Sequence, residues 1–437
     1  MRVTDTGGMG MTKTKSLSFS SIILLGINGI VGSGIFLLPG TLYRQSGMLS
    51  IVAILMAGFS TLLIAMNYAV MASKIDAEGG AYAYASRAFG PLGGFQTGWF
   101  GWLLGVITIS AEIAAFQTVL KSVLVDVHGE WIFDAVGMAI ILLLVVINIS
   151  GTDIIKIFDN LSSAIKVSLL IAFIIVGVWL LSKTSVAVPQ ATPVKASDFT
   201  GTFSTAFYMF TGFSFLLIAA KQMTNPEKTI PRALIISIST VGIIYAAVQF
   251  ILILLQRSSL AGDTMPIATV FNQVFGIAGR MVVLVGIMIS TIGVALAVSF
   301  DTTSDLASLS SDEHLLPAIV GKTTKNGSAL VSIILTMWLA ALLILSGSYL
   351  FLVKLIVLSS FVQYLATIGS LIKLRNDKSL PKGMQIPFGL AIPIISIIII
   401  VYLMFSFNWI SLALAAGAAI IGGVIYCLNA KNPAKAK

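Results

Sequence analysis

Three glycines interrupt an apolar stretch near the amino terminus. Gly29, Gly32 and Gly34 lie within residues 21–46, which are otherwise apolar enough to cross a bilayer. Backbone groups in hydrocarbon must be satisfied internally, so an unwound segment at mid-depth survives only where it faces protein, water or a bound solute. Broken helices of this kind hold polar substrates in secondary transporters. The alternative is a glycine-rich surface on which neighbouring helices pack closely.

A second candidate break lies in a later apolar stretch. Phe210-Thr211-Gly212-Phe213-Ser214 stands in the middle of residues 200–221. Paired interruptions in the two halves of a membrane protein are the best sequence pointer to a central binding site. The pair therefore favours a carrier over a bundle that is only packed.

Two charged residues lie deep inside apolar stretches. Lys166 stands about eight residues into residues 158–181, roughly 12 Å deep at 1.5 Å per residue. A buried ammonium needs a functional or paired explanation, and burial favours its neutral form, so proton exchange and structural pairing are both open. Glu112, within residues 92–121, could contact a cationic group, shuttle a proton or pair with Lys166. The sequence does not choose among these roles.

These residues must be positioned by membrane helices. Of the 437 residues, 57% are hydrophobic and 10% are charged, against roughly 25% charged in a soluble domain. At about 20 apolar residues per crossing, the sequence predicts an all-α membrane protein with twelve transmembrane helices, at residues 20–46, 50–73, 92–121, 132–150, 158–181, 200–221, 233–256, 276–300, 328–346, 349–373, 387–407 and 410–428.

The spans divide into two sets of five followed by two more. A five-span unit repeated in series must be inverted relative to the first. The predicted organisation is a tail at residues 1–19, a first repeat at 20–181, an inverted second repeat at 200–373, two further helices at 387–428 and a tail at 429–437.

The net charge of +9 is explained by orientation. With both termini in the cytoplasm, few loop cations lie outside, which satisfies the positive-inside rule. Those left outside are Arg44, Lys121, Lys183, Lys195, Arg257 and Arg280. The sequence thus predicts a multi-pass protein of the cytoplasmic membrane, in contact with lipid and with no nucleic-acid partner.

Four short motifs give the chain a family resemblance. Gly32-Ser33-Gly34-Ile35-Phe36 is followed by Glu78-Gly79-Gly80-Ala81-Tyr82, by Ala88-Phe89-Gly90-Pro91 and by Asn225-Pro226-Glu227-Lys228. Their order and places resemble the amino acid-polyamine-organocation (APC) superfamily of transporters. The resemblance implies a leucine-transporter-like fold, with 5+5 inverted repeats plus two carboxy-terminal helices, and an amino acid substrate.

A free amino acid presents a carboxylate and an ammonium, and a broken helix offers an end for each. The N–H groups of Ser33, Gly34 and Ile35 suit the carboxylate. The carbonyls of the ending half-helices suit the ammonium, and Gly212, like the other glycines, lets the ligand approach the backbone. These carbonyls belong to Ile30, Val31, Phe210 and Thr211.

The resemblance also assigns roles to side chains. Tyr208 resembles by position the aromatic residue that gates the substrate in this family, although core packing is the simpler role for such a residue. Lys166 resembles the lysine that replaces a sodium ion in some members. Ser290 and Thr291 lie near where that lysine would be coordinated, but such hydroxyls often bond their own helix.

We therefore expect sodium-independent secondary transport of amino acids by alternating access, through proton symport or exchange. A neutral substrate side chain is expected if Glu112 is already engaged with Lys166 or with helix backbone. A cationic amino acid or polyamine carrier is one alternative. The other is a non-transporting nutrient receptor. Two departures from the family pattern keep it open: Ser214 and Lys221 stand where the family often has acidic residues, and an acidic segment stands where it often has a basic one. That segment contains Asp301, Asp305, Asp312 and Glu313.

Enzymatic and ATP-driven functions are not expected. The two histidines, His128 and His314, lie in loops on opposite sides, so they cannot form a metal site or a catalytic dyad. A Walker phosphate loop is absent from the sequence. The sequence predicts no cofactor.

Overall fold

The computed structural model describes residues 18–75, 80–127, 129–150, 153–184, 195–214, 216, 226–311, 315–324, 327–346, 348–381, 383–385 and 388–430. In these ranges every regular element is a helix. Several sequence predictions fall outside them: Glu78, Gly79, His128, Lys221, Asn225, Asp312, Glu313, His314, and most of both tails.

The helices follow the predicted apolar stretches. The first half of the chain contains α1 (Phe19–Ile30), α2 (Gly34–Leu37), α3 (Pro39–Ser46), α4 (Leu49–Lys74), α5 (Ala81–Phe89), α6 (Pro91–Val123), α7 (Glu130–Ser150) and α8 (Asp153–Lys183). The second half contains α9 (Ala196–Tyr208), η1 (Thr211–Ser214), α11 (Pro226–Gln256), η3 (Arg257–Gly262), α12 (Pro266–Ser311), α13 (Ala318–Gly321), α14 (Leu330–Ser346), α15 (Tyr349–Leu374), α16 (Ala391–Met404) and α17 (Trp409–Ala430).

Eight of the helices in the described ranges are long and apolar enough to cross a membrane. The chain is therefore an integral, multi-pass helical membrane protein. Three shorter apolar helices, α1, α14 and α16, cover further stretches that the sequence predicts as spans. The arrangement of twelve spans as two inverted repeats remains a prediction.

Glycines mark the irregular points of two long apolar stretches. The predicted span 20–46 is divided into α1, α2 and α3. Within α12, Gly276 has φ 63° and ψ −157°, a conformation that glycine adopts without steric cost. The predicted span 276–300 begins at this kink, and the helix continues beyond its predicted end to Ser311.

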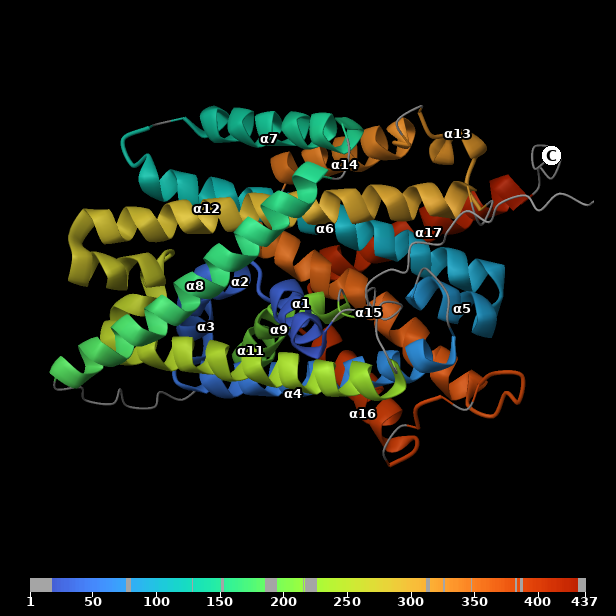
Figure 1. Cartoon of the computed structure of the whole chain (residues 1–437), viewed down its shortest axis with the longest axis horizontal. Coiled ribbons are helices and arrows are strands. Elements are labelled where there is room, and N and C mark those ends of the chain that lie inside the picture. The colour runs from blue at the N-terminus through green and yellow to red at the C-terminus, as the bar shows by residue number, and fades with distance from the viewer. Residues whose placement is uncertain are drawn as a thin grey trace, which may run out of the picture.

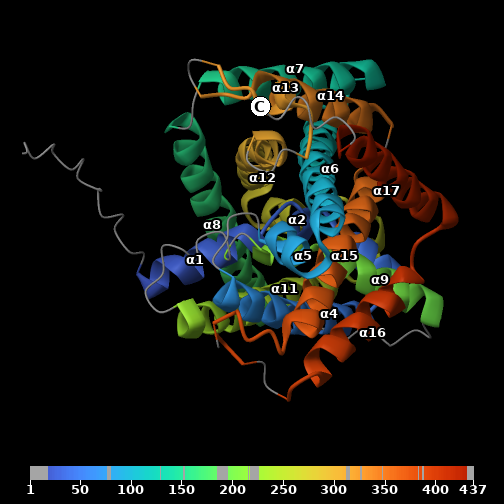
Figure 2. The same cartoon turned by 90° about the vertical axis from the view of Figure 1, so that its right-hand side faces the viewer.

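Helix packing builds a core around the α1–α2 break. In Figure 1 most long helices run along the horizontal axis, with α8 slanting across them. One group consists of α6, α12 and α8, with α15 packed against α6, and a second consists of α4 and α11 (Figures 1 and 2). Both α1 and η1 pack within this arrangement, α1 against α11 and against η1.

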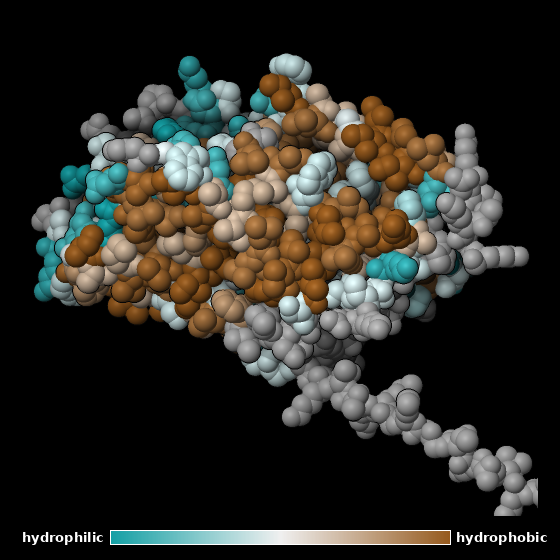
Figure 3. Space-filling view, turned by 90° about the horizontal axis from the view of Figure 1, so that it is seen from above, coloured by the Kyte–Doolittle hydropathy of each residue, from teal (hydrophilic) through white to brown (hydrophobic). Residues whose placement is uncertain are grey.

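The outer surface is apolar over a wide area. Large hydrophobic side chains such as Leu142, Ile175 and Ile420 are exposed. Hydrophobic residues cover most of the face seen in Figure 3, and hydrophilic residues gather toward its ends, most clearly at the left. Lipid tails are as apolar as leucine, so this surface suits a bilayer.

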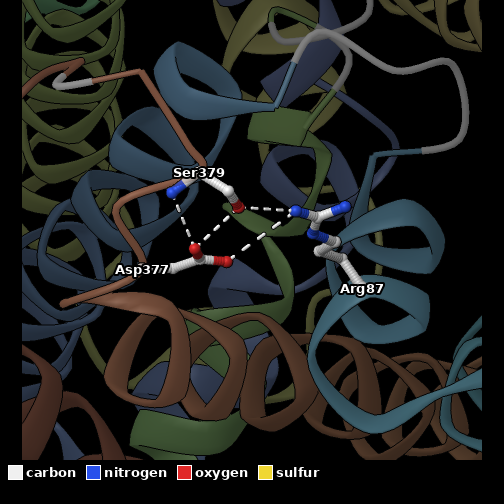
Figure 4. Close-up of polar contacts among 3 residues, drawn as sticks. All are labelled: Arg87, Asp377 and Ser379. Atoms are coloured by element: carbon white, nitrogen blue, oxygen red, sulfur yellow. Dashed lines mark hydrogen bonds and ion pairs between the residues drawn. The ribbon is translucent and has the colours of Figure 1, made fainter.

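Polar contacts join α5 to the loop that follows α15 (Figure 4). Arg87 Nη2 donates to Ser379 Oγ at 2.8 Å and lies 3.8 Å from the Asp377 carboxylate. The side-chain and backbone hydrogen bonds from Ser379, together with the Arg87 charge, hold the pKa of Asp377 below its usual range. The pair is exposed, so its contribution is to fix the loop's position more than to stabilise the fold.

Candidate functional site

The first interruption lies between α1 and α2. Val31 N donates to Ile27 O at 3.0 Å, and Val31 itself is extended, with φ −75° and ψ 104°. The helix resumes at Gly34. Leu38 keeps right-handed helical angles, so α2 continues almost directly into α3. A helix that ends in this way leaves its last carbonyls without intrahelical partners.

Side chains from two other helices bond those carbonyls. Lys166 Nζ, on α8, donates to Asn28 O at 2.8 Å. Tyr245 Oη, on α11, lies 3.4 Å from Ile30 O. A cation at a helix carboxyl end also interacts favourably with the helix dipole. The Ile30 carbonyl, which the sequence offered to a ligand ammonium, therefore already has a donor beside it.

The second interruption abuts the first. After α9 ends at Tyr208, the chain forms the short 3₁₀ helix η1. A Cβ added at Gly212 would lie 1.9 Å from Gly29 O, so only glycine permits this approach. Close backbone packing, the alternative that the sequence left open for these glycines, thus accounts for Gly212.

Ser33 is the centre of a buried hydrogen-bond network. Its hydroxyl donates to Glu112 Oε1 on α6 at 2.9 Å. Its oxygen lies 3.0 Å from Tyr349 Oη on α15 and 3.5 Å from Tyr208 Oη on α9. A serine hydroxyl has one proton to donate, and Ser33 donates it to Glu112 Oε1. The two tyrosine hydroxyls are therefore the donors to the Ser33 oxygen. Three helices therefore meet at the break.

Glu112 is only partly satisfied by this network. The residue is 2% exposed, and its Oε2 is buried with no hydrogen-bond partner among the described residues. Lys166 is not within the 4.0 Å ion-pair distance, since the ion pairs in the described part of the chain are Arg87–Asp377 and Lys121–Glu130. The Glu112–Lys166 pair that the sequence left open is therefore not formed in this structure.

The remaining predicted residues lie in the same core or beside it. Ser33, Val31, Ile30, Ile35 and Phe210 are all buried. A Cβ at Gly34 would meet Met209 Cγ at 3.0 Å and Tyr208 Cε1 at 3.2 Å, so the predicted gate packs directly on this glycine. Thr211 Oγ1 donates to Tyr208 O at 2.9 Å.

Ser290 and Thr291 are both buried on α12. Thr291 Oγ1 donates to Met288 O in its own helix at 3.0 Å. The carbonyl of Ser290 accepts from Ser162 Oγ at 3.3 Å. Thr291 thus shows the backbone bonding that is usual for such a residue in a membrane helix.

Aromatic side chains close the network on two sides. Tyr208 and Tyr349 stack edge to face, with centroids 6.4 Å apart. Within η1, the centroid of the buried Phe213 ring lies 5.6 Å from those of both Tyr68 and Tyr364. Tyr349, Tyr245 and the Phe213 cluster are absent from the sequence predictions. Tyr349 begins a predicted span, where an aromatic residue indicates only a membrane interface.

An apolar helical protein with a buried polar network at a broken helix has the features of a membrane transporter. Comparison with known sequences identifies the class: the amino acid permease family model matches residues 17–428. The chain belongs to this family of transporters, within the APC superfamily, which confirms the family resemblance. Its membership also fits a protein that is not an enzyme.

The sequences of individual relatives match most of the chain. An uncharacterized transporter of Mycobacterium bovis is 30% identical over 83% of this chain and 81% of its own length. A methylthioribose transporter and a branched-chain amino acid permease of Bacillus subtilis are each 25% identical over 96% of this chain and 94% of their own.

Proposed function

We propose that the chain is a sodium-independent secondary transporter of amino acids that works by alternating access. The observation that carries the proposal is the contact of two helix interruptions beside a buried polar network centred on Ser33. Unwound backbone at membrane depth needs hydrogen-bond partners for its N–H and C=O groups, and a polar solute supplies them during transport. Coupling is by proton symport or by exchange.

The predicted membrane arrangement belongs to this proposal. Twelve spans form two inverted five-helix repeats plus two further helices, with both termini in the cytoplasm. Alternating access then comes from movement of one group of helices against another around the break. The protein acts in the cytoplasmic membrane on a small-molecule substrate.

The absence of a sodium requirement rests on Lys166. Its ammonium reaches the end of α1 from α8 and places a positive charge there. A resident cation at this point makes a bound sodium ion unnecessary. Loss of its proton would release α8 from α1, which offers one route to proton coupling.

The substrate is proposed to be an amino acid with a neutral side chain. Glu112 is the one acidic residue among the buried side chains of the described ranges, and Ser33 already engages one of its oxygens. The site therefore has no second buried carboxylate for a basic side chain. Relatives named for branched-chain amino acids and for serine and threonine support this reading, whereas one named for lysine does not.

Binding takes place at the break. The solute lies against Val31, Ser33 and Gly34 on one side and against Phe210 and Thr211 on the other. Tyr208 covers it, because its ring packs on Gly34 and its hydroxyl faces Ser33.

Uptake by the purified protein in sodium-free proteoliposomes tests the proposal. We expect accumulation of at least one labelled neutral amino acid from a panel of alanine, serine, leucine and methionine. Liposomes without protein are the control. Saturable binding without accumulation, including in vesicles preloaded for exchange, would instead support a receptor that keeps the fold.

A further inference from the structure

The carboxylate of Glu112 occupies the start of α2, where the sequence analysis placed a substrate carboxylate. Ser33 donates its hydroxyl to Glu112 Oε1 at 2.9 Å. An acidic side chain thus already lies at the positive end of the α2–α3 helical run. A substrate carboxylate here would have to compete with Glu112 for the single proton of the Ser33 hydroxyl.

The second oxygen of Glu112 lacks a donor. Oε2 is buried, the whole side chain is 2% exposed, and Lys166 is bonded to Asn28 O instead. A buried acceptor without a partner costs about 1–3 kcal/mol, and more when it is charged. A ligand that carries several N–H donors would remove this cost.

Gly32 is the least crowded of the three glycines compared at the two interruptions. Of the described residues, a Cβ added at Gly32 would meet only Glu112 Oε1 within 4 Å, at 3.4 Å. At Gly34 and Gly212, by contrast, an added Cβ runs into packed atoms at 3.0 Å or less. The break is therefore least tightly packed at Gly32, beside Glu112.

We propose that Glu112 binds the ammonium group of the substrate and that the substrate carboxylate is dispensable for recognition. This inference rests on the proposed transport function and names the chemistry of its site. The ligand class is a primary amine with an uncharged side chain, with or without a carboxylate. It includes amino acids, their amides and the amines obtained by removing the carboxylate.

Competition by matched analogues tests the ligand class in the wild-type protein. For leucine the series is leucinamide, 3-methylbutylamine and 4-methylpentanoate, which lacks the amine, and equivalent series exist for alanine and methionine. We expect the amide and the amine to inhibit uptake within about tenfold of the amino acid, a difference of about 1.4 kcal/mol. The deaminated acid should not inhibit. Inhibition by the acid, with none by the amide and amine, would overturn the proposal.

Two substitutions locate the contact. Glu112→Gln keeps an acceptor for Ser33 but removes the charge. It should weaken binding of the amino acid and of the amine together by about tenfold or more, since a charge-assisted hydrogen bond contributes about 1.5–3 kcal/mol. Gly32→Ala puts a methyl group beside Oε1. It should weaken binding of the amino acid and of the amine to a similar extent. Gly201→Ala is the control, because its Cβ meets nothing within 4 Å.

The outcomes separate this inference from the function on which it rests. If amino acids accumulate but amides and amines do not compete, the inference fails and the transport function stands. If Glu112→Gln retains full affinity while its uptake no longer responds to pH, Glu112 carries a proton and the inference is wrong. If the wild type neither binds nor accumulates any of the amino acids, both fail. Size-exclusion profiles establish that each variant is folded. Competition by the analogue series in the wild-type protein tests the proposal without any variant.

Discussion

Lys166 shows how a buried charge can be held without an opposite charge. Its ammonium donates to the Asn28 carbonyl at 2.8 Å, near the carboxyl end of α1. That carbonyl lost its helical partner when the chain unwound at Val31, so the break creates the acceptor that the lysine uses. The bond ties α8 to α1, and its strength depends on the lysine being protonated.

We expect Lys166→Ala to impair net uptake more than binding. Removing the ammonium leaves Asn28 O without this donor and frees α1 from α8, and a hydrogen bond to a charged group contributes about 1.5–3 kcal/mol. Uptake without sodium should fall about tenfold or more, and its response to pH should flatten. Initial rates in proteoliposomes at several pH values measure both effects.

Lys354→Ala is the matched control, since this lysine of α15 is exposed. It should transport as the wild type does. Sodium-stimulated uptake by the wild type, or normal uptake and pH response in Lys166→Ala, would show that Lys166 is only a structural charge.

The sequence predicts the depth of Lys166 but not its partner. Depth follows from the count of apolar residues around the lysine. The Asn28 carbonyl has no signature in the sequence, because every residue carries a backbone carbonyl and only the local unwinding frees this one. For the same reason the Tyr245 contact with Ile30 could not be predicted. Tyr349 reaches Ser33 across most of the chain, and no spacing rule relates the two.

At the scale of elements, the closest approach is between α1 and η1. An alanine methyl at Gly212 would lie 1.9 Å from the Gly29 carbonyl oxygen, and this backbone atom cannot move without moving α1. We expect Gly212→Ala to destabilise the folded protein by about 1–3 kcal/mol, as overpacking does in well-packed cores. Thermal unfolding in detergent should show a lower midpoint.

The control for this effect is Gly201→Ala in the neighbouring helix α9, where an added Cβ has open space. Alanine has the better helix propensity, so this variant should be unchanged or stabilised by up to about 1 kcal/mol. Equal midpoints for Gly212→Ala and Gly201→Ala would mean that α1 and η1 are not in tight contact.

A second element-scale contact joins α15 to the break. The Tyr349 hydroxyl donates to Ser33 at 3.0 Å while its ring packs against Tyr208. We expect Tyr349→Phe to keep the ring packing but to loosen the cover over the site. Bound amino acid should dissociate about two- to tenfold faster, which corresponds to the usual 0.5–1.5 kcal/mol of one hydrogen bond.

Tyr402→Phe provides the comparison, because Tyr402 also donates or accepts one hydroxyl bond, to Thr200 Oγ1 at 2.8 Å, away from the break. Its dissociation rate should match the wild type. If dissociation is accelerated similarly in both variants, the Tyr349 hydroxyl does not hold the cover over the site, and the effect is a general loss of rigidity.

The sequence predicts elements better than their contacts. The glycine spacing places the first interruption between Ile30 and Gly34, and a glycine marks the kink in α12, because irregular backbone has few other residues to use. What the sequence could not separate is the reason for each glycine. Gly212 is required by backbone packing, whereas a Cβ at Gly32 would meet only Glu112 Oε1, at 3.4 Å, and the two glycines are indistinguishable until the neighbouring helices are in place.

For the whole molecule, the charges at its ends predict its orientation in the membrane. Arg87 of α5 bonds Ser379 in the loop after α15, so these two segments lie at the same end (Figure 4). The same end carries Lys373, Arg375 and Lys378 from the end of α15 and its loop. The 3₁₀ helix η3 has one basic residue, Arg257, within its Arg257–Gly262 span. This difference predicts that the α5 end is cytoplasmic and that η3 faces outside.

The single cysteine of the chain makes this orientation directly measurable. Cys427→Ser removes the only native thiol. In that background, Ser258→Cys on η3 should react with a membrane-impermeant maleimide on intact cells, because Ser258 is exposed. Lys378→Cys, also at an exposed position, should react only after the membrane is opened. The reverse labelling pattern would show that the molecule has the opposite orientation in the membrane. It would also place the basic end outside, against the rule from which the orientation is argued.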